Sequence, residues 1–204
     1  MAQKATSKSR TRAKAPAVVQ AQRFELVNAD GEVQAQLTTR PDGLPGLAVA
    51  DGSGSPKVLI AMAADGAVTI SLQDRRGTRR AALGVTAEGG ASLMLVDKQG
   101  KGHALLSVTA DGDTGLGLGD RQGMGRVLLS AHRTGAASLA LFDASGRRRG
   151  GLTSRQDGTP ALILEDAHGN GRVHLTVSAS GEPGLGMGDK DGKGRGLLGV
   201  KADD

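Results

Sequence analysis

The chain has 204 residues and a net charge of +5, with 33 Gly, no Cys, Trp or Tyr, and only two Phe. The lack of Cys excludes disulfides and thiol chemistry, and no apolar run is long enough to cross a bilayer as a helix. An ordered core would have to consist of Leu, Val, Ile and Ala.

The N-terminal stretch differs in charge from the rest of the chain. Residues 1–23 contain six basic residues and no acidic one, which leaves 20 basic and 21 acidic residues, a net charge of −1, in the remainder. Residues 1–17 are rich in Ala, Ser, Thr, Lys and Arg and are predicted to form a disordered basic tail. Such a tail could bind nucleic acid, another anionic polymer or an acidic protein, with a strong salt dependence. The side chains that would make these contacts are Lys4, Lys8, Arg10, Arg12 and Lys14.

Residues 18–204 are predicted to form one β-repeat array, because the sequence repeats every 23 residues, eight times, without an insertion or deletion. A typical unit reads Leu-x-Leu-x-Asp-x-x-Gly-x-x-Arg-x-x-Leu-x-Val-x-x-x-Gly-x-x-x, and positions are numbered from its first Leu. The period is typical of an array of one small unit rather than of an enzyme built around a pocket. The units begin at Phe24, Leu47, Ile70, Leu93, Leu116, Leu139, Leu162 and Leu185.

Positions 5 and 8 of the unit predict a turn. Position 5 is Asp in every unit except the first, which has Asn28, and position 8 is always Gly. Asp-x-x-Gly fits a type I turn in which the Asp side chain accepts a backbone N–H and the Gly adopts a left-handed conformation that closes a three-residue hairpin. A ladder of carboxylates also suits Ca²⁺, but turn capping explains these residues without a metal. The structural turn residues are Asp51, Asp74, Asp97, Asp120, Asp143, Asp166 and Asp189, with Gly54, Gly77, Gly100, Gly123, Gly146, Gly169 and Gly192.

Position 20, which is Gly in every complete unit, marks a second turn. In the first unit, residues 40–43 read Arg-Pro-Asp-Gly, with Pro where its fixed φ suits a type I turn. Between the turns, apolar residues alternate with a period of two, as at Leu116 and Leu118 and at Val127 and Leu129, which predicts strands. We therefore expect two short strands in each unit and about sixteen in all.

Position 11 is basic in six of the eight units, with Gln34 and His103 as the exceptions. Because this position lies across the hairpin from position 5, we expect an ion pair between the basic side chain and the Asp. Together with the neighbouring basic runs at 75–76, 79–80 and 147–149, the row could instead bind an anionic polymer, which the interspersed Asp residues would oppose. The basic residues at position 11 are Lys57, Arg80, Arg126, Arg149, Arg172 and Arg195.

The strand positions that face away from the Leu and Val stripe are small or apolar, as at Gly117, Ala140, Leu105 and Leu128. A sheet with one wet face should carry charged side chains there, so we expect both faces to be covered. Burial of about five aliphatic side chains in each unit is also too little to offset the ordering of 23 residues. Neighbouring units and another chain are expected to supply the missing burial.

The fold class is therefore predicted to be all-β, with eight two-strand repeats in an elongated antiparallel meander, of which three chains could form a prism. The alternative is a two-sided β-solenoid with one unit in each coil. The tight hairpin turns favour the meander. With strands about 4.8 Å apart, a meander would be about 75 Å long and a solenoid about 40 Å.

The stretch from Arg23 to Gly31 reads Arg-Phe-Glu-Leu-Val-Asn-Ala-Asp-Gly and precedes copies of Leu-x-Leu-x-Asp-x-x-Gly-x-x-Arg. It resembles a group of bacterial tandem-repeat proteins, which carry LxLxDxxGxxRxxLxV units after a helical or basic N-terminal segment. The resemblance covers residues 18–204. It implies no catalytic activity.

The side chains show no arrangement typical of catalysis. The four His residues, His103, His132, His168 and His174, fall at four different repeat positions and have no metal-ligand spacing. Gly-rich strand segments such as 115–119 lack the Lys-Ser/Thr of a phosphate-binding loop. We therefore predict that the protein is not an enzyme and has no catalytic residues, no metal and no cofactor.

The predicted function is that of a structural or scaffold protein, a homo-oligomeric β rod, with a trimer favoured, that organises partners. One alternative is association with nucleic acid or an anionic polymer through the basic tail. Another is a surface fibre or adhesin stalk, which would need an export route. Because no signal peptide or transmembrane segment is recognised, a cytoplasmic location is expected, while an extracellular one stays open.

Overall fold

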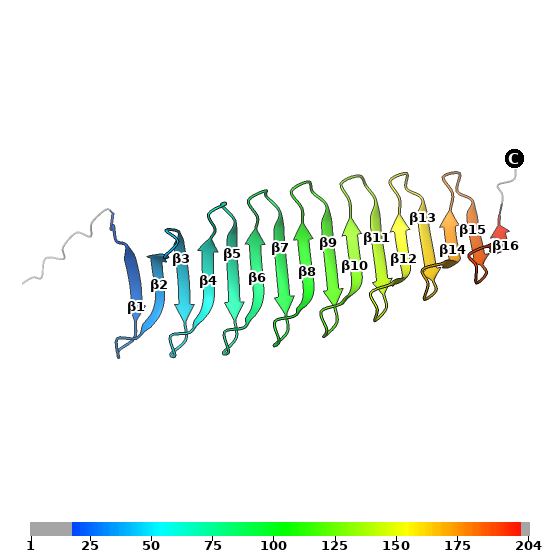
Figure 1. Ribbon diagram of the computed structural model, residues 1–204. Coiled ribbons are helices and arrows are strands. Elements are labelled where there is room, and N and C mark those ends of the chain that lie inside the picture. The colour runs from blue at the N-terminus through cyan, green and yellow to red at the C-terminus, as the bar shows by residue number, and fades with distance from the viewer. Residues whose placement is uncertain (1–17, 201–204) are drawn as a thin grey trace, which may run out of the picture.

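A computed structural model describes residues 18–200, which form one open antiparallel sheet of sixteen strands (Figure 1). Each strand pairs only with its neighbours in the chain, in the order β1 to β16. This order confirms the predicted all-β meander, and it does not fit a solenoid, in which equivalent strands of successive coils would pair in parallel. The predicted disordered tail, residues 1–17, lies outside the described residues. The strands are β1 (Arg23–Val27), β2 (Val33–Thr39), β3 (Pro45–Ala50), β4 (Pro56–Met62), β5 (Val68–Gln73), β6 (Arg79–Val85), β7 (Ala91–Val96), β8 (Gly102–Val108), β9 (Thr114–Gly119), β10 (Gly125–Ala131), β11 (Ala137–Phe142), β12 (Arg148–Ser154), β13 (Pro160–Glu165), β14 (Gly171–Val177), β15 (Pro183–Gly188) and β16 (Gly194–Gly199).

Hairpin turns of a single geometry connect the strands. At each turn the N–H of the fourth residue donates to the C=O of the first, and the N–H of the first donates to the C=O of the fifth, as from Gly123 to Asp120 at 2.8 Å and from Asp120 to Met124 at 2.9 Å. The fourth residue is always Gly, with φ between +76° and +92°. This left-handed conformation is costly for any residue with a Cβ, which explains the Gly at positions 8 and 20.

The two kinds of turn lie along the two long edges of the sheet (Figure 1). We call the edge formed by positions 5–11 of the units the Asp-turn edge, and the edge formed by positions 17–21 the opposite edge.

Hairpins on the Asp-turn edge contain a β-bulge at position 11. Between β9 and β10, for example, Gly119 lies opposite Gly125 and Leu118 lies opposite Val127, so that Arg126 is the extra residue. A bulge bends its strand and redirects a side chain, here toward the turn. The bulged residues are Gln34, Lys57, Arg80, His103, Arg126, Arg149, Arg172 and Arg195.

The sheet is a single layer without a core of its own. Among residues 18–200, the buried apolar residues are Ala48 and Ala161, and no large side chain is fully buried. No other part of the described chain covers either face (Figure 1). The prediction that both faces are covered therefore remains a prediction, and it requires another molecule to cover them. None of the residues in this range forms a helix long and apolar enough to cross a membrane.

The left-handed turn glycines can be tested with a matched pair of substitutions. A Cβ on Gly112 (φ +92°) or on the strand residue Gly117 would meet no atom within 4 Å, so the two sites differ in backbone conformation and not in space. We expect Gly112→Ala to lower the free energy of unfolding by about 1–2 kcal/mol. Gly117→Ala should leave it unchanged or raise it by up to about 1 kcal/mol. Urea unfolding followed by circular dichroism measures both, and equal losses would contradict the turn geometry.

Candidate interaction surfaces

An Asp carboxylate fixes each turn on the Asp-turn edge. Asp143 Oδ1 accepts the Ser145 hydroxyl at 2.6 Å and the backbone N–H groups of Ser145 and Arg147 at 2.9 and 3.1 Å. The Ser145 hydroxyl, followed by the Arg147 N–H, lowers the pKa of Asp143 to about 2. The same two backbone N–H contacts recur in the other units, at Asn28, Asp51, Asp74, Asp97, Asp120, Asp166 and Asp189.

The second carboxylate oxygen of these Asp residues faces the bulged side chain at position 11. Lys57 Nζ lies 3.0 Å from Asp51 Oδ2, and Arg126 Nε donates to Asp120 Oδ2 at 2.7 Å. Both oxygens of each carboxylate are thus engaged within the unit. In the described part of the chain, no group of three or more His, Asp or Glu residues could hold a metal ion.

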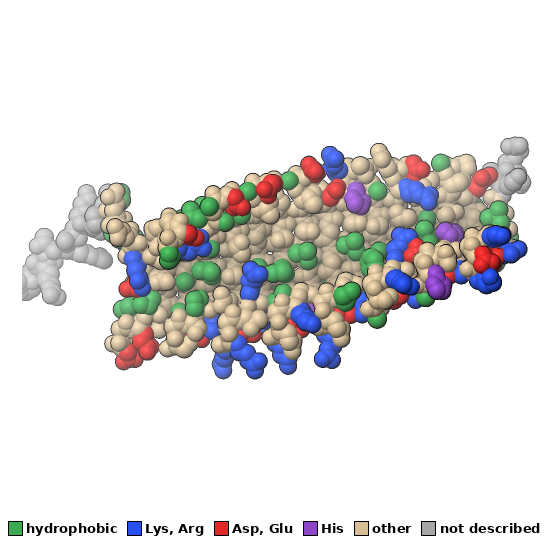
Figure 2. Space-filling view, viewed as in Figure 1, with side chains coloured by type: hydrophobic (Ala, Val, Ile, Leu, Met, Phe, Trp, Pro, Cys, Tyr) green, Lys and Arg blue, Asp and Glu red, His purple; other side chains and the backbone are tan. Residues whose placement is uncertain are grey.

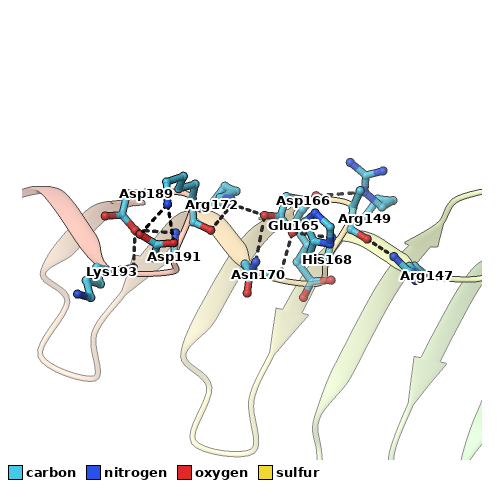
Figure 3. A network of polar contacts seen from close by, with 12 residues as sticks. Arg147, Arg149, Glu165, Asp166, His168, Asn170, Arg172, Asp189, Asp191 and Lys193 are labelled. Carbon is cyan, nitrogen blue, oxygen red and sulfur yellow. Dashed lines mark hydrogen bonds and ion pairs between the residues drawn. The ribbon is translucent and has the colours of Figure 1, made fainter.

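Several position-11 side chains also reach the next unit. Lys57 Nζ donates to the C=O of Asp74 at 3.1 Å, and Arg80 Nε donates to the C=O of Val96 at 3.1 Å. Further along, Arg149 and Arg172 donate to backbone carbonyls of the following unit at 3.2 and 3.0 Å. The bulge therefore places one side chain where it joins its own turn to the neighbouring unit. Figure 3 shows this ladder along the edge from Arg147 to Lys193.

One face of the sheet is continuously apolar. Its central row contains one large apolar residue from each of the sixteen strands, and each lies opposite the next across the strand pairs. Twelve of the sixteen side chains are between 37% and 70% exposed. The row consists of Phe24, Leu37, Leu47, Ile60, Ile70, Leu83, Leu93, Leu106, Leu116, Leu129, Leu139, Leu152, Leu162, Leu175, Leu185 and Leu198.

Two flanking rows extend this apolar face on either side. The row nearer the Asp-turn edge runs from Leu26 to Gly196 and holds only Leu, Val, Ala, Met and Gly. The row nearer the opposite edge runs from Thr39 to Pro183 and holds Val, Ala, Met, Pro, Thr and Ser. The three rows contain no charged residue. We call them together the apolar face.

The other face carries smaller side chains. In the middle of the sheet, its central row alternates in size through Leu105, Gly117, Leu128 and Ala140. A second row consists of Gly, Ala, Ser and Thr across most of the sheet, and in it Ser130 and Ser138 share a hydrogen bond of 2.8 Å. Along this second row, the small side chains leave the backbone close to the surface. We call it the small-residue face.

The two long edges carry opposite net charge. The Asp-turn edge contains sixteen basic and ten acidic residues, whereas the described turns of the opposite edge contain seven acidic and three basic residues. In Figure 2, Lys and Arg gather along the lower edge, and Asp and Glu recur along the upper one. The seven acidic residues of the opposite edge are Asp42, Asp65, Glu88, Asp111, Asp113, Asp157 and Glu182.

The candidate residues from the sequence fall into two groups. The turn residues at positions 5 and 8 lie together on the Asp-turn edge. The anion-contact residues Lys4, Lys8, Arg10, Arg12 and Lys14 lie outside the described residues. The contact from position 11 to the next unit did not follow from the sequence, because it depends on the bulge. The basic residue that recurs at position 11 was the only feature of the sequence that pointed to this contact.

No family model matches the chain, and no curated protein sequence matches it. Several solved structures are similar to it over most of its length. The TCP domain of Drosophila melanogaster SAS-4 (dCPAP), solved in complex with a proline-rich motif of Ana2 (dSTIL), is 16% identical, with a TM-score of 0.47 over 86% of this chain and 96% of that chain. The TCP10 domain of Danio rerio CPAP is 15% identical, with a TM-score of 0.34 over 87% and 94%. The G-box domain of the microcephaly protein CPAP is 14% identical, with a TM-score of 0.36 over 83% and 99%. At these sequence identities and TM-scores, the similarity does not indicate what this chain binds or does.

His103 stands where most units have Lys or Arg, and its ring lies between two oxygen atoms. Its Nε2 lies 3.1 Å from Asp97 Oδ2, and its Nδ1 lies 3.2 Å from the C=O of Gly119. Both neighbouring oxygens are acceptors, so this position favours the charged form of the ring. Asp97, followed by the Gly119 carbonyl, raises the pKa of His103 above its usual 6.5, and Asp120 contributes in the same direction.

This pKa predicts a pH dependence of stability. Because the pKa is higher in the folded state, the stabilisation by His103 is fully present below about pH 6.5 and is lost as the pH rises through the folded-state pKa. His103→Arg restores the common residue and should remove this loss. Urea midpoints of both proteins between about pH 5 and 9 test it, and an NMR titration of the ring gives the pKa directly. A pKa at or below 6.5 would contradict the contacts.

Proposed function

We propose that the protein is a non-catalytic structural protein that assembles with copies of itself through the apolar face and serves as a scaffold for partners. The observation that carries the proposal is the apolar face, whose three rows run along the sheet without a charged residue. Exposed apolar patches of monomeric proteins rarely exceed a few hundred Å². A single-layer sheet needs a second layer to remove such a face from water.

The size of the apolar face supports this proposal. Sixteen strands at about 4.8 Å span about 75 Å, and strands of six or seven residues are about 20 Å long. The face therefore covers on the order of 1,500 Å², compared with about 800 Å² on each partner in a typical stable interface. A second copy has a face of the same length and spacing, so it can cover the whole array.

The strand length favours three copies. Three sheets about 20 Å wide, arranged as the sides of a triangular prism, have walls about 6 Å from the central axis. This distance is close to half the roughly 10 Å that separates packed sheets, so Leu side chains from the three apolar faces would fill the interior. The small-residue faces would then form the outer surface, where partners could approach the backbone.

Matched pairs of Leu residues on the two faces test the assembly. On β8 and β10, Leu106 and Leu129 lie on the apolar face and are 51% and 50% exposed, whereas Leu105 and Leu128 lie on the small-residue face and are 44% and 43% exposed. The double variant Leu106→Glu/Leu129→Glu should be monomeric, because it would bury unpaired charges. Leu105→Glu/Leu128→Glu should keep the wild-type mass. Light scattering at micromolar concentration measures this, with circular dichroism as a control for folding. A monomeric wild-type protein would disprove self-assembly.

A second candidate function is association with nucleic acid or an acidic partner through the basic tail. It is favoured by six basic residues and no acidic residue in 1–23. We expect binding to duplex DNA at low salt to weaken steeply as salt rises, and to be lost on deletion of residues 1–16. Fluorescence anisotropy with a labelled duplex measures both effects. Equal affinity with and without the tail, or no binding at low salt, would rule this function out.

A further inference from the structure

The charges of the two long edges are complementary at the same level along the array. In its middle, the Asp-turn edge exposes Arg75, Arg76, Lys98, Lys101 and Arg121. The opposite edge exposes three acidic residues in the turns that alternate with these, namely Asp65, Glu88 and Asp111. The turn Asp residues on the basic edge are held by backbone N–H groups and by position 11, so they do not cancel these exposed cations.

The spacing of the charges is the same on both edges. Each unit adds two strands, or about 9.6 Å, to the length of the sheet, and it adds one turn to each edge. When two copies lie side by side without an axial shift, the basic turns at 74–77 and 97–100 of one copy each lie midway between two acidic turns of the other, about 4.8 Å from each along the array. The shared repeat keeps this match between the opposite-edge turns at 63–66 and 109–112, whereas the following turn of that edge, 132–135, has Arg133 and no acidic residue.

The apolar faces limit how two copies can pack. A rotation about the long axis of the sheet brings apolar face to apolar face and puts the Asp-turn edge of one copy beside the opposite edge of the other. A rotation about the strand direction also joins the apolar faces, but it puts like edges together and sets Arg75 and Lys98 near the basic edge of the partner copy. Like charges in contact oppose that second arrangement.

We propose that copies of this chain associate in parallel, with equivalent units level and with the Asp-turn edge of each copy against the opposite edge of the next. This inference rests on the proposed self-assembly and adds its orientation. A two-fold or three-fold axis along the array satisfies it, and both close without an open end. The apolar face supplies most of the affinity, whereas the edges select the orientation.

Cysteine cross-linking tests this arrangement, because the chain contains no Cys. Gln99 is exposed in a turn of the Asp-turn edge, and Ala110 is exposed in the next turn of the opposite edge. The two lie at opposite ends of β8, about 20 Å apart, so a short bis-maleimide cannot join them within one chain. The double variant Gln99→Cys/Ala110→Cys should give covalent dimers or trimers. Each single variant should stay uncross-linked.

The outcomes separate this inference from the proposal on which it rests. If the wild-type protein is an oligomer by light scattering but the single variants cross-link as well as the double one, like edges meet and the parallel arrangement is wrong. An oligomeric double variant that does not cross-link also overturns it, because the copies are then shifted. A monomeric wild-type protein overturns self-assembly as well.

Charge exchange gives a second readout. Lys98→Glu/Lys101→Glu, introduced into the double-cysteine chain, should reduce cross-linking several-fold. Adding Glu88→Lys/Asp111→Lys, which restores the complementarity with the signs exchanged, should recover it. If the first pair leaves cross-linking unchanged and abolishes binding of duplex DNA instead, the basic edge serves an anionic polymer and the orientation proposal fails.

Discussion

The left-handed glycine that closes each hairpin is the constraint on which the rest of the molecule depends. With φ between +76° and +92° at every turn, each hairpin has the same three-residue loop, and no strand can shift its pairing by a residue without losing that turn. A fixed register then places each repeat position in a straight row across the sheet. The row from Phe24 to Leu198 and the ladder of Asp and Arg along one edge are both consequences of it.

A sheet of this kind is stabilised by contacts between neighbours rather than by a core. Each strand touches only the strand before it and the strand after it, so cross-strand pairs such as Leu116 and Leu129 provide local apolar contact. On the Asp-turn edge, the bulge adds a link of longer range. Arg80 joins Asp74 of its own unit to the carbonyl of Val96 in the next, which couples units that otherwise meet at a single strand pair.

The sequence was sufficient for the strands, the turns and the meander, because all three depend on local spacing. Asp120 and Gly123 specify the turn whatever surrounds them, and Leu116 and Leu118 specify which residues share a face. It was not sufficient for the contact from Arg149 to the carbonyl of Glu165, because the bulge lies at the start of β12, where it does not interrupt the alternating pattern that follows. The basic and acidic turns can be read from the sequence, but their separation onto two edges is a property of the sheet. Turn 74–77 joins β5 to β6 on one edge, and turn 86–89 joins β6 to β7 on the other.

The same repetition that makes the fold also makes it incomplete. A globular domain removes its apolar side chains from water by folding back on itself, but identical units with identical short turns cannot fold back, since no turn differs from the others. Leu106 and Leu129 are therefore left half-exposed in the middle of the array, where a chain that functioned alone would have polar residues. The chain instead keeps its charges at the turns, Arg75 and Lys98 on one edge and Asp65 and Glu88 on the other. An apolar face between two edges of opposite charge suits association with another copy of the chain in a single orientation, because the face supplies the affinity and the edges select the orientation.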